Sequence, residues 1–187
     1  PMGAEEGIIK GLYRMQKTAK PAKKHVNLMG SGTILVQAIK AAEMLKEDFG
    51  VTSDIWSATS FNELARDGQD CLRHNRLNPL AEERVPYVTQ VMDGLKGPVI
   101  CATDYIKNYG EQIRAFVPNR FTVLGTDGFG RSDSRVNLRK FFEVDANHIA
   151  AAAMVDLYRD GAVSEKDLEK ALSKYDIDGG KPNPRLV

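Results

Sequence analysis

The sequence has few of the residues that build disulfide scaffolds or metal sites. It contains two cysteines thirty residues apart, Cys71 and Cys101, and three well-separated histidines, His25, His74 and His148. This spacing excludes a disulfide framework and a zinc ribbon, and it argues against a His-rich metal centre. Cys101 falls within a predicted strand and is expected in the core. We therefore expect a reducing compartment, the cytoplasm, and no metal ligands within this chain.

The chain also lacks a strong charge of one sign and a long apolar run. It has 26 basic and 25 acidic residues, a formal net charge of +1. A protein dedicated to nucleic acid needs a basic surplus to neutralise phosphates, so we expect no nucleic-acid partner. No stretch approaches the roughly 18 apolar residues of a membrane span, and no apolar leader opens the chain. We therefore expect no membrane partner.

What the chain does contain is enough apolar material for a folded core. Of its 187 residues, 42% are hydrophobic and 27% are charged, which is ordinary for one globular domain. Pro1 precedes the first methionine, and residues 1–3 do not resemble a natural start. We expect residues 1–187 to form a single domain, excised from a longer polypeptide.

Short apolar segments alternate with amphipathic helices along the chain. Strands are predicted within residues 6–16, 25–29, 53–58, 98–102 and 121–124. Helices are predicted at 33–49, from 61 to about 72, 87–95, 105–117, 138–142, 146–160 and from Ser164 onward. This alternation predicts a three-layer α/β/α sandwich with a mostly parallel, five-stranded sheet. The first strand should be antiparallel, because we expect residues 17–24 to join it to the second as a hairpin.

Small and hydroxyl-bearing residues follow four of the predicted strands. The turns read GSG at 30–32, ATS at 58–60, ATD at 102–104 and GTD at 125–127. In open α/β sheets, ligands bind beyond this edge, where hydroxyls and backbone amides hold anions. The alternative is that these residues only form turns and cap helices. Asp104 and Asp127 have the same two interpretations, as acid–base groups or as helix caps.

Nucleotide and nucleophile motifs are incomplete or absent. Gly30 and Gly32 open a dinucleotide-type spacing, but position 35 is a leucine where the third glycine should stand. No GxxxxGK[ST] loop and no GxSxG turn occur in the sequence. Cys71 lies three residues before His74 on a predicted helix. The two side chains either form a nucleophilic pair or have this spacing by accident.

Residues 10–24 form the one basic run. Six cations occur there with no acid between them: Lys10, Arg14, Lys17, Lys20, Lys23 and Lys24. Such a run can bind an acidic partner. We favour the simpler interpretation of a solvated hairpin.

The segment 124–135, LGTDGFGRSDSR, is the most distinctive in the chain. It combines three glycines with Asp127, Phe129, Arg131, Ser132 and Arg135. Glycine-rich loops adopt positive φ and present backbone amides, and guanidinium groups bind carboxylates and phosphates. We therefore select these five residues as candidate contacts, either to a ligand or to another domain.

This loop and the helices after it resemble the last domain of transketolase-like enzymes. Those enzymes carry a D-x-F-G-x-S loop and then a helix with a leucine and a phenylalanine, matched here by Asp127, Phe129, Gly130, Ser132, Leu138 and Phe142. Further matches are GAEEGIIKGLY from Gly3, LMGSGTIL from Leu28, TSFNELARDGQDC from Thr59, TDY from Thr103 and the final NPRLV. Together they span Gly3 to Val187 and resemble the carboxyl-terminal domain of homodimeric bacterial pyruvate dehydrogenases.

The resemblance implies a function for a longer polypeptide. The whole chain of that family uses thiamine diphosphate and Mg²⁺ to decarboxylate pyruvate, and it acetylates the lipoyl group of a dihydrolipoyl acyltransferase core. Its cofactor lies between the other two domains of a dimer, so the resemblance implies no catalytic, cofactor-binding or metal residue here. This chain also lacks the GDG-type cofactor motif, because no matching asparagine follows Asp127 and Gly128.

Two hypotheses follow from these observations. The first is a structural, dimer-supporting domain that is inactive alone, with the rest of its polypeptide, a second copy and the acyltransferase core as partners. The second is a free-standing α/β domain that binds an anionic ligand at the carboxyl edge of its strands. The second hypothesis predicts stabilisation by that ligand, whereas the first predicts a much longer native polypeptide.

Overall fold

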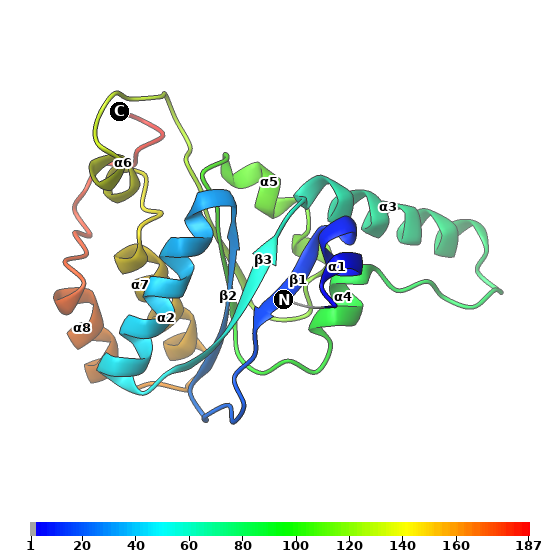
Figure 1. Ribbon diagram of the computed structural model, residues 1–187, viewed down its shortest axis with the longest axis horizontal. Coiled ribbons are helices and arrows are strands. Elements are labelled where there is room, and N and C mark those ends of the chain that lie inside the picture. Colours follow the sequence, from blue (N-terminus) through cyan, green and yellow to red (C-terminus); the bar gives the residue numbers. More distant parts are fainter. Residues whose placement is uncertain (1–2) are drawn as a thin grey trace.

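The computed structural model describes residues 3–187; Pro1 and Met2, on which the interpretation of the amino terminus rests, lie outside the described residues. A five-stranded sheet forms its centre, with helices on both faces (Figure 1). The strands lie in the order β1 (Leu12–Gln16), β3 (Thr52–Ala58), β2 (His25–Ser31), β4 (Val99–Ala102) and β5 (Phe121–Leu124). β1 is antiparallel to β3, and the other neighbouring pairs are parallel. The predicted α/β/α sandwich is confirmed.

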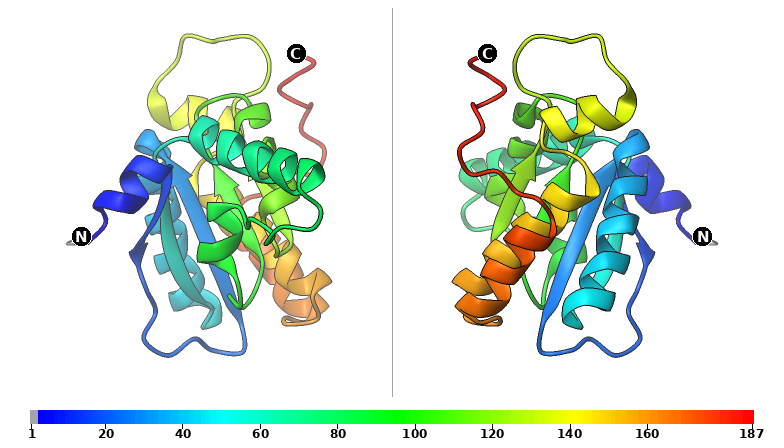
Figure 2. Two further views of the ribbon diagram at one scale, coloured as in Figure 1. Left: turned by 90° about the vertical axis from the view of Figure 1, so that its right-hand side faces the viewer. Right: turned by 90° about the vertical axis from the view of Figure 1, so that its left-hand side faces the viewer.

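Helices cover both faces of the sheet and create two separate cores (Figure 2). On one face lie α2 (Leu35–Phe49), α7 (Ala146–Arg159) and α8 (Glu165–Lys174), and on the other lie α3 (Phe61–Leu77), α4 (Tyr87–Met92) and α5 (Lys107–Glu111). Successive strand residues alternate between the cores, since Leu28 belongs to the first and Met29 to the second. Parallel strands buried on both faces tend to be continuous apolar runs, as β4 (VICA) is, whereas β2 and β3 also contain polar residues.

The first strand has the predicted direction but a different partner. β1 pairs with β3, and β2 lies between β3 and β4, so the expected hairpin is wrong. Residues 17–24 instead run past the start of β3. There the Thr18 hydroxyl donates to the Ser53 carbonyl (2.7 Å) and the Ala22 amide donates to Thr52 Oγ1 (3.0 Å). The central position covers both edges of β2, and all seven of its residues are buried.

The segment before β1 is a helix where a strand was expected. α1 (Glu5–Lys10) ends at Gly11, whose φ of +99° is left-handed and costs glycine little. A Cβ on Gly7 would lie 2.8 Å from the Leu12 carbonyl oxygen, so the helix folds back tightly onto β1.

Most helix ends follow the predicted chemistry, but several ranges change; α4, for example, ends at Met92, three residues before the expected end. Gly50 closes α2 with φ +64°, and Ser60 Oγ accepts from the Glu63 amide (3.2 Å) at the start of α3. α3 runs to Leu77, five residues beyond the expected end. The helix expected at 105–117 divides into α5 and a 3-10 turn at Arg114–Phe116, and α6 occupies Arg135–Phe141. No described helix is both long and apolar enough to cross a bilayer.

Candidate functional site

All five candidate residues lie beyond the carboxyl edge of the sheet. The loop that carries them leaves β5 and returns through α6 (Figure 1). Its base is fixed by the Thr126 amide, which donates to the Tyr105 carbonyl (2.9 Å). Gly128 has φ +107°, and a Cβ there would lie 2.5 Å from the Pro184 carbonyl oxygen. The loop therefore requires glycine where the carboxyl-terminal tail crosses it.

Asp127 is a helix cap. Its Oδ1 accepts a hydrogen bond from the Lys107 amide (2.9 Å), the first amide of α5. Ser31 and Thr103 also satisfy each other at the ends of β2 and β4, with their hydroxyl oxygens 2.6 Å apart. The turn-and-cap interpretation therefore holds for this part of the edge, and it explains why α5 begins only at Lys107.

Asp104 faces a cavity of about 440 Å³ at the same edge. The cavity is lined by Thr33, Ile34, Asp104, Thr126, Gly128, Gly130, Arg131, Arg135, Leu138, Arg139, Phe142 and Val144. Its floor is apolar, because it is formed by the side chains of Ile34 and Val144, each of which is 1% exposed. Its rim is cationic, with three arginines against one aspartate. The structure thus brings Arg131 and Arg135 together and adds Arg139, which the sequence did not single out.

Phe129 and Ser132 point into solvent. Phe129 is 85% exposed, and Val136, in the first turn of α6, is 76% exposed. Within residues 3–187, the Ser132 side chain makes no hydrogen bond. Arg131 behaves differently, because its guanidinium lies 4.2 Å from the centre of the Phe141 ring in a cation–π contact. The candidate loop therefore has one packed arginine and an outward-facing aromatic tip.

Cys71 and His74 do not form a nucleophilic pair. Cys71 is buried on α3, and burial, helped by nearby Asp67, raises the pKa of its thiol. A reactive cysteine needs a lowered pKa, so this thiol is suited to packing. His74 Nδ1 instead lies 3.5 Å from the side-chain nitrogen Nδ2 of Asn78. Cys101 is fully buried in β4, as predicted, and burial likewise raises its thiol pKa.

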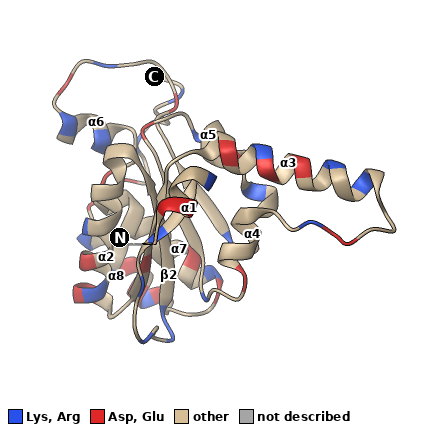
Figure 3. Ribbon diagram, turned by 45° about the vertical axis from the view of Figure 1, so that its right-hand side comes forward, with Lys and Arg blue, Asp and Glu red and all other residues tan. Residues whose placement is uncertain are grey.

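The basic run is divided over three places: Lys10 ends α1, Arg14 lies in β1, and the other four cations lie on the loop 17–24 below the amino edge of the sheet (Figure 3). Three of its six cations are paired with acids. The pairs are Lys10–Glu6 (2.8 Å), Arg14–Asp54 (3.1 Å) and Lys24–Asp167 (3.4 Å). Lys17, Lys20 and Lys23 form no ion pair within residues 3–187. The loop 17–24 is therefore solvated as expected, but it does not close a hairpin, because β1 pairs with β3.

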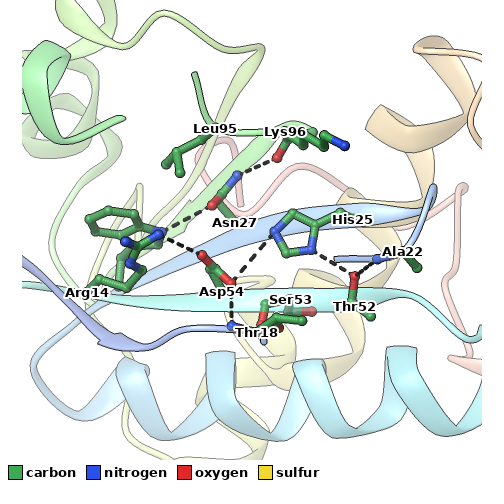
Figure 4. A network of polar contacts seen from close by, with 12 residues as sticks. Arg14, Thr18, Ala22, His25, Asn27, Thr52, Ser53, Asp54, Leu95 and Lys96 are labelled. Carbon is green, nitrogen blue, oxygen red and sulfur yellow. Dashed lines mark hydrogen bonds and ion pairs between the residues drawn. The ribbon is translucent and has the colours of Figure 1, made fainter. Parts of the chain in front are cut away.

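A network of buried polar side chains lies at the amino edge, and it was not predicted from the sequence (Figure 4). His25 Nδ1 lies 2.8 Å from Thr52 Oγ1, while its Nε2 is 3.8 Å from Asp54 Oδ1, beyond hydrogen-bond range. The Asp54 carboxylate accepts from Arg14 (3.1 Å) and from the Thr18 amide (2.7 Å). Burial lowers the pKa of His25, so the ring is neutral at pH 7 and the pair is not a charged dyad.

The network extends through β2 to the loop before β4. Asn27 Nδ2 donates to the Lys96 carbonyl (2.9 Å), and Trp56 Nε1 donates to Asn27 Oδ1 (3.2 Å). The signal in the sequence was the polar residues at positions 25, 27 and 54 inside otherwise apolar strands. Because the bonds face inward, the network holds strands together. Within residues 3–187, no three His, Cys, Asp or Glu side chains are placed to hold a metal ion.

Comparisons with known proteins agree with this geometry. Residues 11–145 match the family model of the transketolase-like TK C-terminal domain. The pyruvate dehydrogenase E1 components of Escherichia coli K12 and Pseudomonas aeruginosa are 52% and 51% identical, over 100% and 98% of this chain. In both cases the chain spans 21% of the relative's length.

Solved structures show the same fold at low identity. Transketolase from Leishmania mexicana aligns with TM-score 0.54 and 18% identity over 85% of this chain and 20% of that chain. Transketolase from Campylobacter jejuni aligns with TM-score 0.53 and 17% identity over 78% of this chain and 18% of that chain. The chain therefore belongs to the family of transketolase-like C-terminal domains.

Proposed function

We propose that the chain is the carboxyl-terminal domain of a pyruvate dehydrogenase E1 component, with a structural and dimer-supporting role. The observation that carries this proposal is the 52% identity along the whole chain to a relative of that name, of which the chain spans 21%. Identity at this level along the whole chain supports a common fold and a common place in the longer polypeptide.

The longer polypeptide would decarboxylate pyruvate with thiamine diphosphate and Mg²⁺ in the cytoplasm. It would then acetylate the lipoyl group of a dihydrolipoyl acyltransferase core. The residues of this chain do not fit the cofactor. The one aspartate–glycine pair in the loop, Asp127-Gly128, uses its carboxylate to cap α5. We therefore assign cofactor binding and chemistry to the remainder of the polypeptide, and we derive no catalytic step from this domain.

The carboxyl edge supports a contact with that remainder or with a second copy. Phe129 in the loop is 85% exposed, Val136 in the first turn of α6 is 76% exposed, and Tyr105, whose carbonyl accepts from the Thr126 amide at the base of the loop, is 57% exposed. Large apolar side chains grouped on one surface mark protein contacts, and aromatic residues are enriched at their centres. Arg131, another of the five sequence-based candidates for this contact, stacks on Phe141. Phe129 is the cleaner probe, because its side chain is almost fully in solvent.

The test uses the full polypeptide that carries this chain. We expect Phe129→Asp to weaken the dimer by at least about tenfold, since a charge replaces a buried interface aromatic, and to lower pyruvate decarboxylation in parallel. Analytical ultracentrifugation and an assay with thiamine diphosphate, Mg²⁺ and pyruvate measure the two effects. Tyr158→Asp is the matched control, because Tyr158 is exposed near the opposite edge, at the end of α7.

Two results would contradict the proposal. One is an unchanged dimer and unchanged activity in Phe129→Asp. The other is turnover of pyruvate by the 187-residue chain alone, since this chain offers no group for the cofactor.

A further inference from the structure

The 440 Å³ cavity at the carboxyl edge lies where the strand order reverses. From β2 the chain passes to β3 on one side, whereas β4 and β5 lie on the other side. Thr33 follows β2 and Asp104 follows β4, and both line the cavity. In open α/β sheets, the crevice at this reversal is left uncovered by the connections and is where ligands bind. The topology alone therefore provides an open site here.

Three guanidinium groups line this cavity, and none of them is paired with a carboxylate among the described residues. Arg131, Arg135 and Arg139 form no ion pair within residues 3–187. Arg139 donates to Thr33 Oγ1 (3.3 Å), and Arg131 stacks on Phe141. Arg135 makes no hydrogen bond among the described residues, so its donors are unoccupied.

The balance of charge at the cavity favours an anion. Three arginines face one carboxylate, Asp104, whose nearest hydrogen-bond donor is the Thr33 hydroxyl at 3.4 Å. Like charges held together repel, and an anion between them removes that repulsion. The planar fork of arginine matches carboxylate and phosphate oxygens in pairs. An anionic group would therefore be held by the rim.

The floor of the cavity requires an apolar part in the same ligand. Ile34 and Val144 are fully buried beneath it, and Leu138 and Phe142 are partly exposed on its wall. Inorganic phosphate alone would leave this surface in water, whereas a compact apolar group would cover it. Asp104 adds an acceptor for a hydroxyl or amino group of the ligand.

We propose that this cavity binds a small organic anion, in which a carboxylate or phosphate is joined to a compact apolar group. The arginines at 131, 135 and 139 hold the anionic end, and the floor covers the apolar end. Phe129 does not line the cavity. The loop can therefore contact a neighbouring domain through Phe129 and hold the ligand through its arginines. The inference stands independently of the proposed enzyme.

The test is calorimetric titration of the full polypeptide with four probes. Phenyl phosphate and benzoate carry both parts of the expected ligand, and they separate phosphate from carboxylate. Inorganic phosphate lacks the apolar part, and benzyl alcohol lacks the charge. We expect phenyl phosphate or benzoate to bind at least about tenfold more tightly than either single-feature probe, because both halves of the cavity contribute.

Variants locate the binding. Arg135→Ala should weaken the better probe at least about tenfold, since a charge-assisted hydrogen bond is lost, and Arg135→Lys should recover part of the affinity. Both variants should keep the thermal midpoint of the parent, because the Arg135 side chain makes no hydrogen bond in the fold. Arg73→Ala is the matched control, an exposed arginine on α3 away from the cavity.

The proposal is overturned if neither phenyl phosphate nor benzoate binds. It is equally overturned if Arg135→Ala binds the better probe as tightly as the parent does. Neither result concerns dimerisation. Loss of the dimer in Phe129→Asp would likewise not by itself abolish binding of the probe at the cavity. The two proposals can therefore fail separately.

Discussion

The two edges of the central sheet treat their polar side chains in opposite ways. At the amino edge, His25, Asn27 and Asp54 are at most 4% exposed, and each has a hydrogen-bond partner inside the fold. At the carboxyl edge, arginines surround a cavity without ion pairs, and Phe129 is 85% exposed. The comparison separates polar groups whose hydrogen bonds stabilise the fold from charged groups that have no ion-pair partner in it.

The physical reason lies in the cost of burial. A buried polar group without a partner destabilises the fold, so the amino-edge groups bond to one another. A surface arginine has water as its partner; Arg131 stacks on Phe141 and Arg139 donates to Thr33, but none of the three has a carboxylate partner within residues 3–187. Their mutual repulsion at one cavity is then a cost that ligand binding explains and folding does not.

The largest expected effect is at the amino edge. Asp54→Ala removes the acceptor of Arg14 and of the Thr18 amide. We expect a loss of about 3 kcal/mol or more in the free energy of unfolding, because breaking a buried pair leaves its partners unsatisfied. Urea denaturation of the 187-residue chain measures this loss. Asp104→Ala at the carboxyl edge should cost about 0.5 kcal/mol or less, and equal losses would remove the distinction between the edges.

A glycine beside the same network should come next. Gly97 has φ +78°, and a Cβ there would lie 1.8 Å from the His25 carbonyl oxygen. Gly97→Ala combines backbone strain with this clash, and we expect a cost of about 3 kcal/mol. Gly50→Ala is the control, because φ is +64° and nothing lies within 4 Å. Gly50→Ala should cost about 1 kcal/mol by strain alone. Urea denaturation measures both variants, and equal losses of stability would contradict a contribution from the clash at Gly97.

The pH dependence of stability tests the neutral state of His25. Burial is the largest cause that lowers its pKa, Lys96 acts in the same direction, and Asp54 opposes them. Below the unfolded pKa of about 6.5, the unfolded chain binds a proton that the folded chain refuses. Stability should therefore fall as the pH decreases from about 6.5 toward the lower folded pKa. His25→Gln should be less stable at pH 7 yet show a shallower decline between pH 7 and 5. A slope identical to that of the parent would assign the decline to other groups.

The smallest stability effects belong to the carboxyl edge. Ser132→Ala and Arg135→Ala remove exposed side chains that make no hydrogen bond in the described structure. We expect each to change the free energy of unfolding by about 0.5 kcal/mol or less, as measured by thermal denaturation. A loss above about 2 kcal/mol in either variant would show that the loop belongs to the folding core.

Local chemistry made much of the fold predictable from the sequence. The apolar runs at 98–102 and 121–124 are strands because both faces of the sheet are covered. The Ser60 cap and the Gly50 helix end follow from backbone amides and left-handed φ, which depend on neighbouring residues alone. The edge loop was identifiable because glycine, aspartate and arginine rarely gather in a mere connector.

Non-local geometry was not predictable in the same way. A strand and a short turn do not reveal which neighbour the strand will pair with, so β1 was assigned to β2 when its partner is β3. The amino-edge network joins residues 14, 25 and 54, which look like isolated polar residues until the strands align. Arg139 lines the cavity because α6 brings it to Thr33, which is 106 residues away in the sequence.

The central claim is that the rest of a larger enzyme covers the carboxyl edge. Amide hydrogen exchange at residues 128–132 tests this claim most directly. None of these five amides donates a hydrogen bond within residues 3–187, so they should exchange rapidly in the 187-residue chain. In the full polypeptide we predict at least about tenfold slower exchange there, with the amino-edge strands unchanged. Equally fast exchange in both forms would show that nothing covers this edge and would contradict the account.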